Sequence, residues 1–174
     1  MTTLTESDLQ ITINEDIVNA HRFDDRTNHG LSHCMSAVDF VVELAESYLY
    51  IEIKDPQAPQ VPERETSRFH ERFVGEQLDE EFKYKYRDSF LYEWASGRAN
   101  KPIHYLVLIG LDFLTKAELA RRTVALGQKL PLLGPGAIAW ARPFVESCNV
   151  FNISSWNETF PRYPVTRLSA SEQA

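Results

Sequence analysis

The sequence predicts an α/β domain with a mixed β-sheet flanked by helices, and three patterns lead to this prediction. Two runs rich in β-branched and aromatic residues, 36–44 and 48–54, are separated by only two or three residues, which is typical of a hairpin. Apolar residues then recur at helical spacing over residues 78–96. Residues 103–110 form a continuous apolar run of the kind found in strands covered on both faces. Strands and helices in this order favour one sheet with helices packed on it.

The N-terminal third contributes strands and loops around the hairpin. Residues 9–13 alternate between apolar and polar side chains and predict a strand, with residues 18–23 as its partner. Residues 24–30 read as a loop. Asp55-Pro56 ends the second hairpin strand, because proline cannot continue a central ladder. The proline-rich residues 57–65 predict another loop, followed by no more than a short helical turn at about residues 68–75.

Two helices and a last strand complete the predicted order. Apolar side chains recur every four residues from Leu78 to Trp94, and the helix is expected to end at Gly97. The capping-box pattern of residues 115–118 opens a second helix that reaches about Lys129. Residues 145–153 predict a strand, and the tail after Trp156, which contains Pro161 and Pro164, is expected to be irregular.

Composition limits the class of protein. The 174 residues are 43% hydrophobic and 25% charged, the proportions of a soluble globular chain. We therefore expect one domain over residues 1–174, with its core at about 36–153. Cys34 and Cys148 lie far apart and lack metal-ligand spacing, which favours a cytoplasmic location. The polar N-terminus resembles no signal peptide, and no apolar run approaches the roughly twenty residues of a membrane helix, so we expect no membrane partner.

The net charge of −7 is unevenly distributed along the chain. Residues 1–82 carry 18 acidic and 6 basic residues, whereas residues 83–174 carry 7 acidic and 12 basic ones. The overall charge therefore does not exclude a nucleic-acid partner. The uneven distribution predicts that one face binds nucleic acid weakly and in a salt-sensitive way, or that the charges of a partner protein complete the binding.

The predicted hairpin carries the candidate catalytic and metal-binding residues. Asp39 lies within an apolar strand, and Glu52 and Lys54 alternate with isoleucines, so these two share one face of the next strand. If Ala45-Glu46 is a two-residue loop, Asp39 lies opposite Glu52, with Cβ atoms about 4.5–5.5 Å apart. Carboxylates this close repel each other unless a cation lies between them, and a divalent metal is the usual solution.

A solvated sheet face with salt bridges is the alternative interpretation of Asp39, Glu52 and Lys54, because any alternating strand has a polar face. The apolar neighbours of Asp39 argue against this alternative, since an unpaired carboxylate is costly among them.

Asp39, about a dozen residues and then Glu52-x-Lys54 on a hairpin, followed by a helix and a buried strand, resembles the PD-(D/E)XK nuclease superfamily. The similarity covers roughly residues 36–110. It implies the restriction-endonuclease-like fold and a Mg²⁺-dependent nuclease that can use Mn²⁺ and favours DNA. It also implies that Asp39, Glu52 and the backbone carbonyl of Ile53 hold the metal. Lys54 would be the catalytic lysine that positions or activates the attacking water.

Two features of the superfamily differ in this chain. Val38 stands where many members have a proline before the first acidic residue. Many members also place a further glutamate on a helix before the hairpin, for which Glu15 is the candidate here.

Basic residues on the two predicted helices are candidate nucleic-acid contacts. In the first helix Lys83 and Arg87 share a face, because they are four residues apart. The alternative is a solvated helix surface with ion pairs to the neighbouring acidic residues. The candidates are Lys83, Lys85, Arg87, Arg121 and Arg122.

The sequence thus predicts a metal-dependent nuclease, or the nuclease subunit of a larger complex. A chain of 174 residues leaves little room for a separate domain that reads sequence, so a partner protein, a homodimer or a particular DNA structure would supply specificity. The rival prediction is an inactive nuclease-like subunit that serves as a protein–protein assembly module. A hydrolase of small phosphoesters is a third, and it would need a closed pocket.

Overall fold

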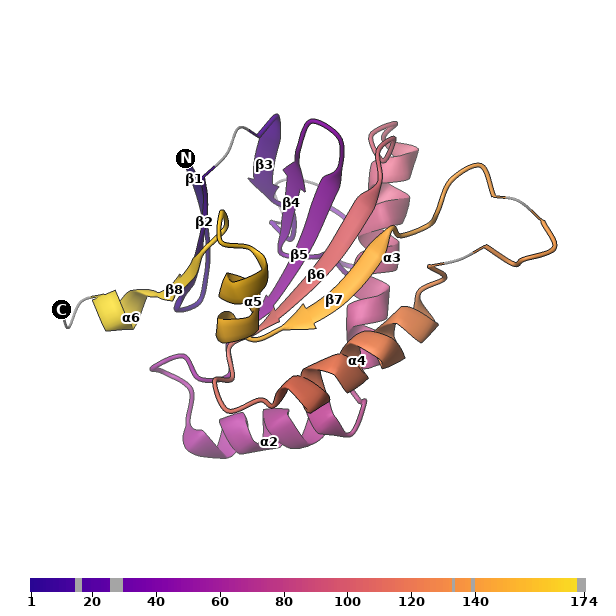
Figure 1. Cartoon of the computed structure of the whole chain (residues 1–174). Coiled ribbons are helices and arrows are strands. Elements are labelled where there is room, and N and C mark those ends of the chain that lie inside the picture. Colours follow the sequence, from indigo (N-terminus) through magenta and orange to yellow (C-terminus); the bar gives the residue numbers. More distant parts are fainter. Residues whose placement is uncertain (15–16, 26–29, 133, 139, 172–174) are drawn as a thin grey trace.

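The computed structural model describes residues 1–14, 17–25, 30–132, 134–138 and 140–171. At its centre is a five-stranded sheet in the order β3-β4-β5-β6-β7 (Figure 1). Neighbouring strands from β3 to β5 are antiparallel, and those from β5 to β7 are parallel. The predicted mixed sheet of an α/β protein is therefore confirmed. The strands are β3 (Asn19–Arg22), β4 (Phe40–Glu43), β5 (Tyr48–Lys54), β6 (Ile103–Ile109) and β7 (Ser147–Phe151).

The β4–β5 hairpin has the predicted register. Phe40 pairs with Ile51, and the N–H of Leu44 donates to the carbonyl of Ser47 at 2.9 Å across the two-residue turn. Ile51 and Ile53 belong to one of the two hydrophobic clusters of the protein. Because side chains alternate along a strand, Glu52 faces the other cluster.

Three helices pack on the face of the sheet toward which Glu52 points: α2 (Glu63–Val74), α3 (Asp79–Ala95) and α4 (Lys116–Lys129). Figure 1 shows α3 running behind the sheet, with α2 and α4 below it. Buried aromatic residues fill the space between helices and strands, including Phe73, Phe82, Tyr86 and Tyr105. The predicted capping box opens α4, where the Thr115 side chain and the Glu118 backbone and side chain exchange hydrogen bonds.

Residues 57–75 differ from the prediction of a loop and a short turn, because α2 spans twelve residues. Pro62 precedes its first residue, and Glu63 and Glu65 lie in the first turn. Proline is tolerated at a helix start, and acidic side chains there interact favourably with the helix dipole.

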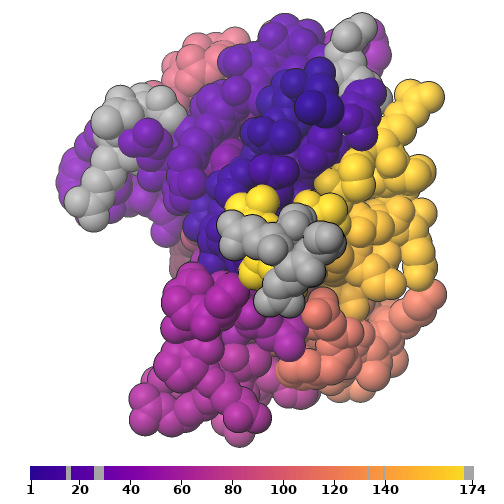
Figure 2. Space-filling view, turned by 90° about the vertical axis from the view of Figure 1, so that its left-hand side faces the viewer, coloured from indigo at the N-terminus to yellow at the C-terminus, as the bar shows by residue number. Residues whose placement is uncertain are grey.

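The opposite face of the sheet is covered by both ends of the chain. A small sheet of β1 (Thr2–Glu6), β2 (Leu9–Ile13) and β8 (Val165–Arg167) packs there with α5 (Ile153–Thr159), and α6 (Leu168–Ser171) follows. In Figure 2 the indigo N-terminal and yellow C-terminal residues lie side by side on the surface. No helix of the described residues is long and apolar enough to cross a membrane.

Two predictions about these terminal segments are wrong. Strand β2 pairs with β1 and β8, whereas β3 from the expected partner segment pairs with β4. The tail is regular rather than irregular, because Pro161 and Pro164 fall between α5 and β8 and interrupt neither. Burial of Trp156 and Val165 in the second cluster stabilises this arrangement.

Candidate active site

The fold brings the three predicted catalytic residues together on the sheet face beneath α3. Asp39 immediately precedes β4, and its Oδ2 accepts the backbone N–H of Ile53 at 2.6 Å. On β5, Oε1 of Glu52 lies 3.0 Å from the Nζ of Lys54. Glu52 is 0% exposed and Asp39 is 4% exposed. The hairpin alone therefore places two buried carboxylates and one ammonium group side by side.

Lys85 enters this cluster from α3. Its Nζ lies 2.7 Å from Oε1 of Glu52 and 3.4 Å from Oδ1 of Asp39. The sequence suggested a nucleic-acid contact for Lys85, but the structure places its ammonium group between the two carboxylates. Lys85 is thus a residue of the candidate active site.

A polar stripe on α3 explains how Lys85 reaches the site. Glu81, Lys85 and Ser89 are spaced four residues apart, so they lie on one face of the helix. The Ser89 hydroxyl accepts the N–H of Val38 at 3.0 Å, which holds this face against the start of β4. The spacing of this polar stripe can be read from the sequence, next to the apolar stripe of the same helix. The sequence does not show that the stripe faces Asp39 and Glu52.

The site is open to solvent on the side of Lys54. Glu81 lies 3.0 Å from the Nζ of Lys54 and 3.9 Å from the guanidinium of Arg72. Beside them is a pocket of about 420 Å³ between β5 and α2, which is lined by Lys54, Arg68 and Arg72 and also by Asp55 and Glu65. Arg68 and Arg72 were not identified from the sequence, because the full length of α2 was not predicted. Glu81 was not identified either, although it lies on the predicted helix α3.

Burial dominates the electrostatics of the two carboxylates. Loss of solvation raises the pKa of Asp39, and attraction to Lys85 offsets part of that effect. Loss of solvation, with repulsion from Asp39, raises the pKa of Glu52 to about 7 in spite of Lys54 and Lys85. Burial would lower the pKa of Lys54, but Glu52 and Glu81 raise it above its ordinary value. The site therefore favours additional positive charge.

The donor atoms fit a hard divalent cation. The Oε1 atom of Glu52 contacts the ammonium groups of Lys85 at 2.7 Å and Lys54 at 3.0 Å. Its Oε2 atom is buried and has no hydrogen-bond partner among the described residues. Orphaned buried acceptors of this kind are rare. Mg²⁺ typically binds through one or two carboxylates and keeps several waters, so Asp39 and Glu52 suffice as protein ligands. The described residues contain no cluster of three or more His, Cys, Asp or Glu at metal-binding positions.

The structure does not test the metal-binding roles predicted for Ile53 and Glu15. The backbone N–H of Ile53 donates a hydrogen bond to Asp39. A bond between the Ile53 carbonyl and a metal ion stays a prediction. Glu15 lies outside the described residues.

The other four predicted nucleic-acid contacts differ in their burial and ion pairing. Arg122 is only 2% exposed and pairs with Asp79 at 3.0 Å and with Glu76 at 2.8 Å. Burial in these ion pairs argues against its assignment as a phosphate contact. Lys83 pairs with Glu80, as the alternative of a solvated helix surface anticipated. Arg87 and Arg121 are exposed.

Comparison with known proteins identifies no relative: no protein-family model, no curated protein and no solved structure matches the chain.

Proposed function

We propose that this protein is a divalent-metal-dependent nuclease with a restriction-endonuclease-like fold, with DNA as the favoured substrate. One observation carries the proposal: the fully buried carboxylate of Glu52 lies beside Asp39 and a solvent-accessible lysine, and its Oε2 atom has no hydrogen-bond partner among the described residues. The order of hairpin, helix and buried parallel strand supports it, because the resemblance of the sequence rests on the same order. A cytoplasmic location stays a prediction.

Each residue of the site has a role in this proposal. Asp39 and Glu52 would hold Mg²⁺ or Mn²⁺. When bound, the ion would act as a Lewis acid that offsets charge on the phosphate and makes water more acidic. The ammonium of Lys54 lies on the open side of the site, where it can bind a phosphate oxygen or orient water. Arg68 and Arg72 in the adjoining pocket can hold a neighbouring phosphate.

Lys85 favours the second candidate function, an inactive nuclease-like subunit that acts as an assembly module. Its ammonium group already lies between Asp39 and Glu52, as a cation would in a purely structural ion-pair cluster. In the active protein, metal binding would displace this ammonium group and leave it available to the substrate. The two candidates therefore differ in whether a metal ion can replace Lys85.

Lys54→Met should reduce cleavage without preventing folding. The protein is incubated with single- and double-stranded DNA and RNA in Mg²⁺, in Mn²⁺ and with a chelator. We expect cleavage only with metal, and a loss of roughly 10²–10³-fold in the variant, the usual cost of removing one charge-stabilising group. Lys116→Met is a matched control, because the Lys116 side chain is 84% exposed. Absence of cleavage of every substrate by the unmodified protein would favour the assembly module instead.

A further inference from the structure

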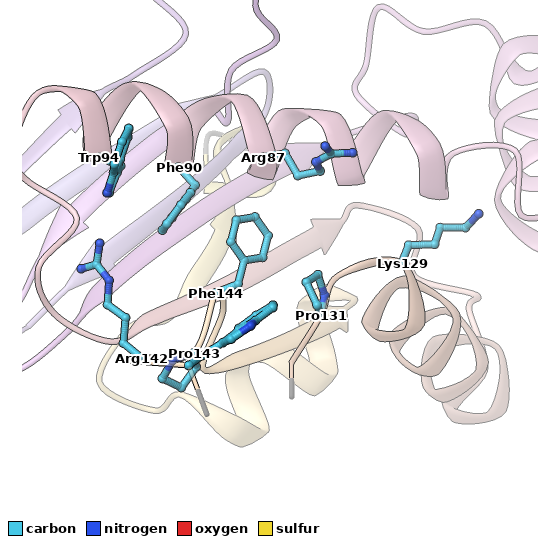
Figure 3. A pocket seen from close by; sticks show the side chains of 9 residues that line it. Arg87, Phe90, Trp94, Lys129, Pro131, Arg142, Pro143 and Phe144 are labelled. Atoms are coloured by element: carbon cyan, nitrogen blue, oxygen red, sulfur yellow. The ribbon is translucent and has the colours of Figure 1, made fainter. Parts of the chain in front are cut away.

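A second pocket lies on another side of α3. It has a volume of about 480 Å³ and is formed by the C-terminal half of α3, the end of α4 and the segment before β7. Arg87, two residues after Lys85, contributes to it. Residues two apart on a helix point about 200° away from each other, so this pocket is separate from the carboxylate site. Figure 3 shows Arg87, Phe90 and Trp94 on α3 facing Arg142 and Phe144 across the gap.

Aromatic rings form the walls and floor of this pocket. Trp94 is 57% exposed and Trp140 is 43% exposed, although side chains of this size are usually mostly buried. Phe90 and Phe144 make an edge-to-face contact with ring centroids 4.6 Å apart. A Cβ atom on Gly134 would lie 3.2 Å from Cγ of Trp140, so the absence of a side chain there allows the indole to pack against the backbone. The exposed rings are thus supported by the structure around them.

The charge of the pocket is positive. Arg87, Lys129 and Arg142 line it, and none of its described lining residues is acidic. Lys129 pairs with Glu80 at 2.6 Å, and Arg142 donates to the carbonyl of Ala99. Neither Arg87 nor Arg142 forms an ion pair with a carboxylate in the described part of the chain. Exposed aromatic faces together with such guanidinium groups are complementary to a flat ring attached to an anion.

We propose that this pocket binds an unpaired nucleotide of a single-stranded nucleic acid. The base stacks on the indoles of Trp94 and Trp140, and Arg87 and Arg142 bind the flanking phosphates. Stacking of this kind tolerates any base and supplies much of the affinity for single strands. Binding itself needs no metal. The further statement that the bound strand is the substrate of the nuclease rests on the proposed function.

Titration of the protein with a 15-nucleotide oligo(dT) in the presence of a chelator tests the proposal. Because bases stacked on indoles quench their emission, we expect the intrinsic tryptophan fluorescence to fall, while the buried Trp156 retains its emission. Trp140→Ala should weaken binding by roughly tenfold. Arg87→Ala should reduce the dependence of affinity on salt by about one phosphate contact. The exposed Lys116 provides the control variant Lys116→Ala, which should bind like the unmodified protein.

Other outcomes would overturn the proposal. Unchanged affinity in Trp140→Ala and Arg87→Ala, or no binding by the unmodified protein, would contradict it. Equal binding and quenching by a blunt duplex would exclude an unpaired base as the ligand. Self-association that Trp140→Ala abolishes, without any binding of oligo(dT), would identify the pocket as a protein interface. Asp39→Asn separates the two hypotheses, because it should abolish cleavage and leave this binding intact.

Discussion

Replacement of Glu52 by glutamine should make the metal-free protein more stable above pH 7 and, at the same time, abolish metal-dependent cleavage. Burial raises the pKa of Glu52 from 4.5 to about 7. Between these values the folded chain holds a proton that the unfolded chain has lost. The free energy of unfolding must therefore fall as the pH rises through this window, by roughly 3 kcal/mol in all. Glutamine has no such proton to lose, and cleavage should fall by at least about 10³-fold, because a ligand of the Lewis acid is gone.

Urea unfolding at pH 5 and pH 8 with a chelator, together with a cleavage assay at pH 8, checks this prediction. Both lysines keep a carboxylate in the variant, since Lys85 contacts Asp39 and Lys54 contacts Glu81. Glu46→Gln is the matched control, because Glu46 is exposed in the turn of the same hairpin. A variant less stable than the unmodified protein at pH 8 would show that the lysines outweigh the cost of burial.

Arg122→Met should destabilise the protein by about 3–5 kcal/mol, the usual cost of leaving one member of a buried ion pair alone. Arg122 and Asp79 each have side chains that are 2% exposed. Burial already raises the pKa of Asp79 above its ordinary value, and Arg122 limits that rise. Loss of the guanidinium therefore leaves a buried acidic group between α3 and α4 without its partner.

Urea denaturation at pH 7 measures this loss. The adjacent Arg121 is exposed, so Arg121→Met should change the free energy of unfolding by no more than about 0.5 kcal/mol. Equal effects of the two variants would mean that Arg122 does not hold the helices together.

The candidate site was predictable from the sequence where local rules determine it. A two-residue turn sets the register of β4 and β5, and alternation places Glu52 and Lys54 on one face. Lys85 was named from the sequence in a different role, because its contacts with Asp39 and Glu52 depend on the packing of a helix 30 to 50 residues away in the chain. In the same way, nothing in the Arg121-Arg122 pair shows which guanidinium is buried until Asp79 is placed next to it.

The terminal segments were harder to predict for a related reason. Leu9 pairs with Arg167, and such long-range pairing leaves no local signal in a strand as short as β8. Helix α2 is amphipathic, but its few apolar residues, Phe69, Phe73 and Val74, lie in its C-terminal half. Its N-terminal half is polar and follows a proline-rich segment, which reads as a loop.

The central claim is that Asp39 and Glu52 together bind a divalent metal. Calorimetric titration of the protein with Mn²⁺ tests it most directly, because binding is measured whether or not a substrate is known. We expect one metal site per chain, loss of that site in Asp39→Asn, and tighter binding in Lys85→Met, where no ammonium group competes for the two carboxylates. If neither the unmodified protein nor Lys85→Met binds Mn²⁺, or if Asp39→Asn binds it equally well, the carboxylate pair is not a metal site.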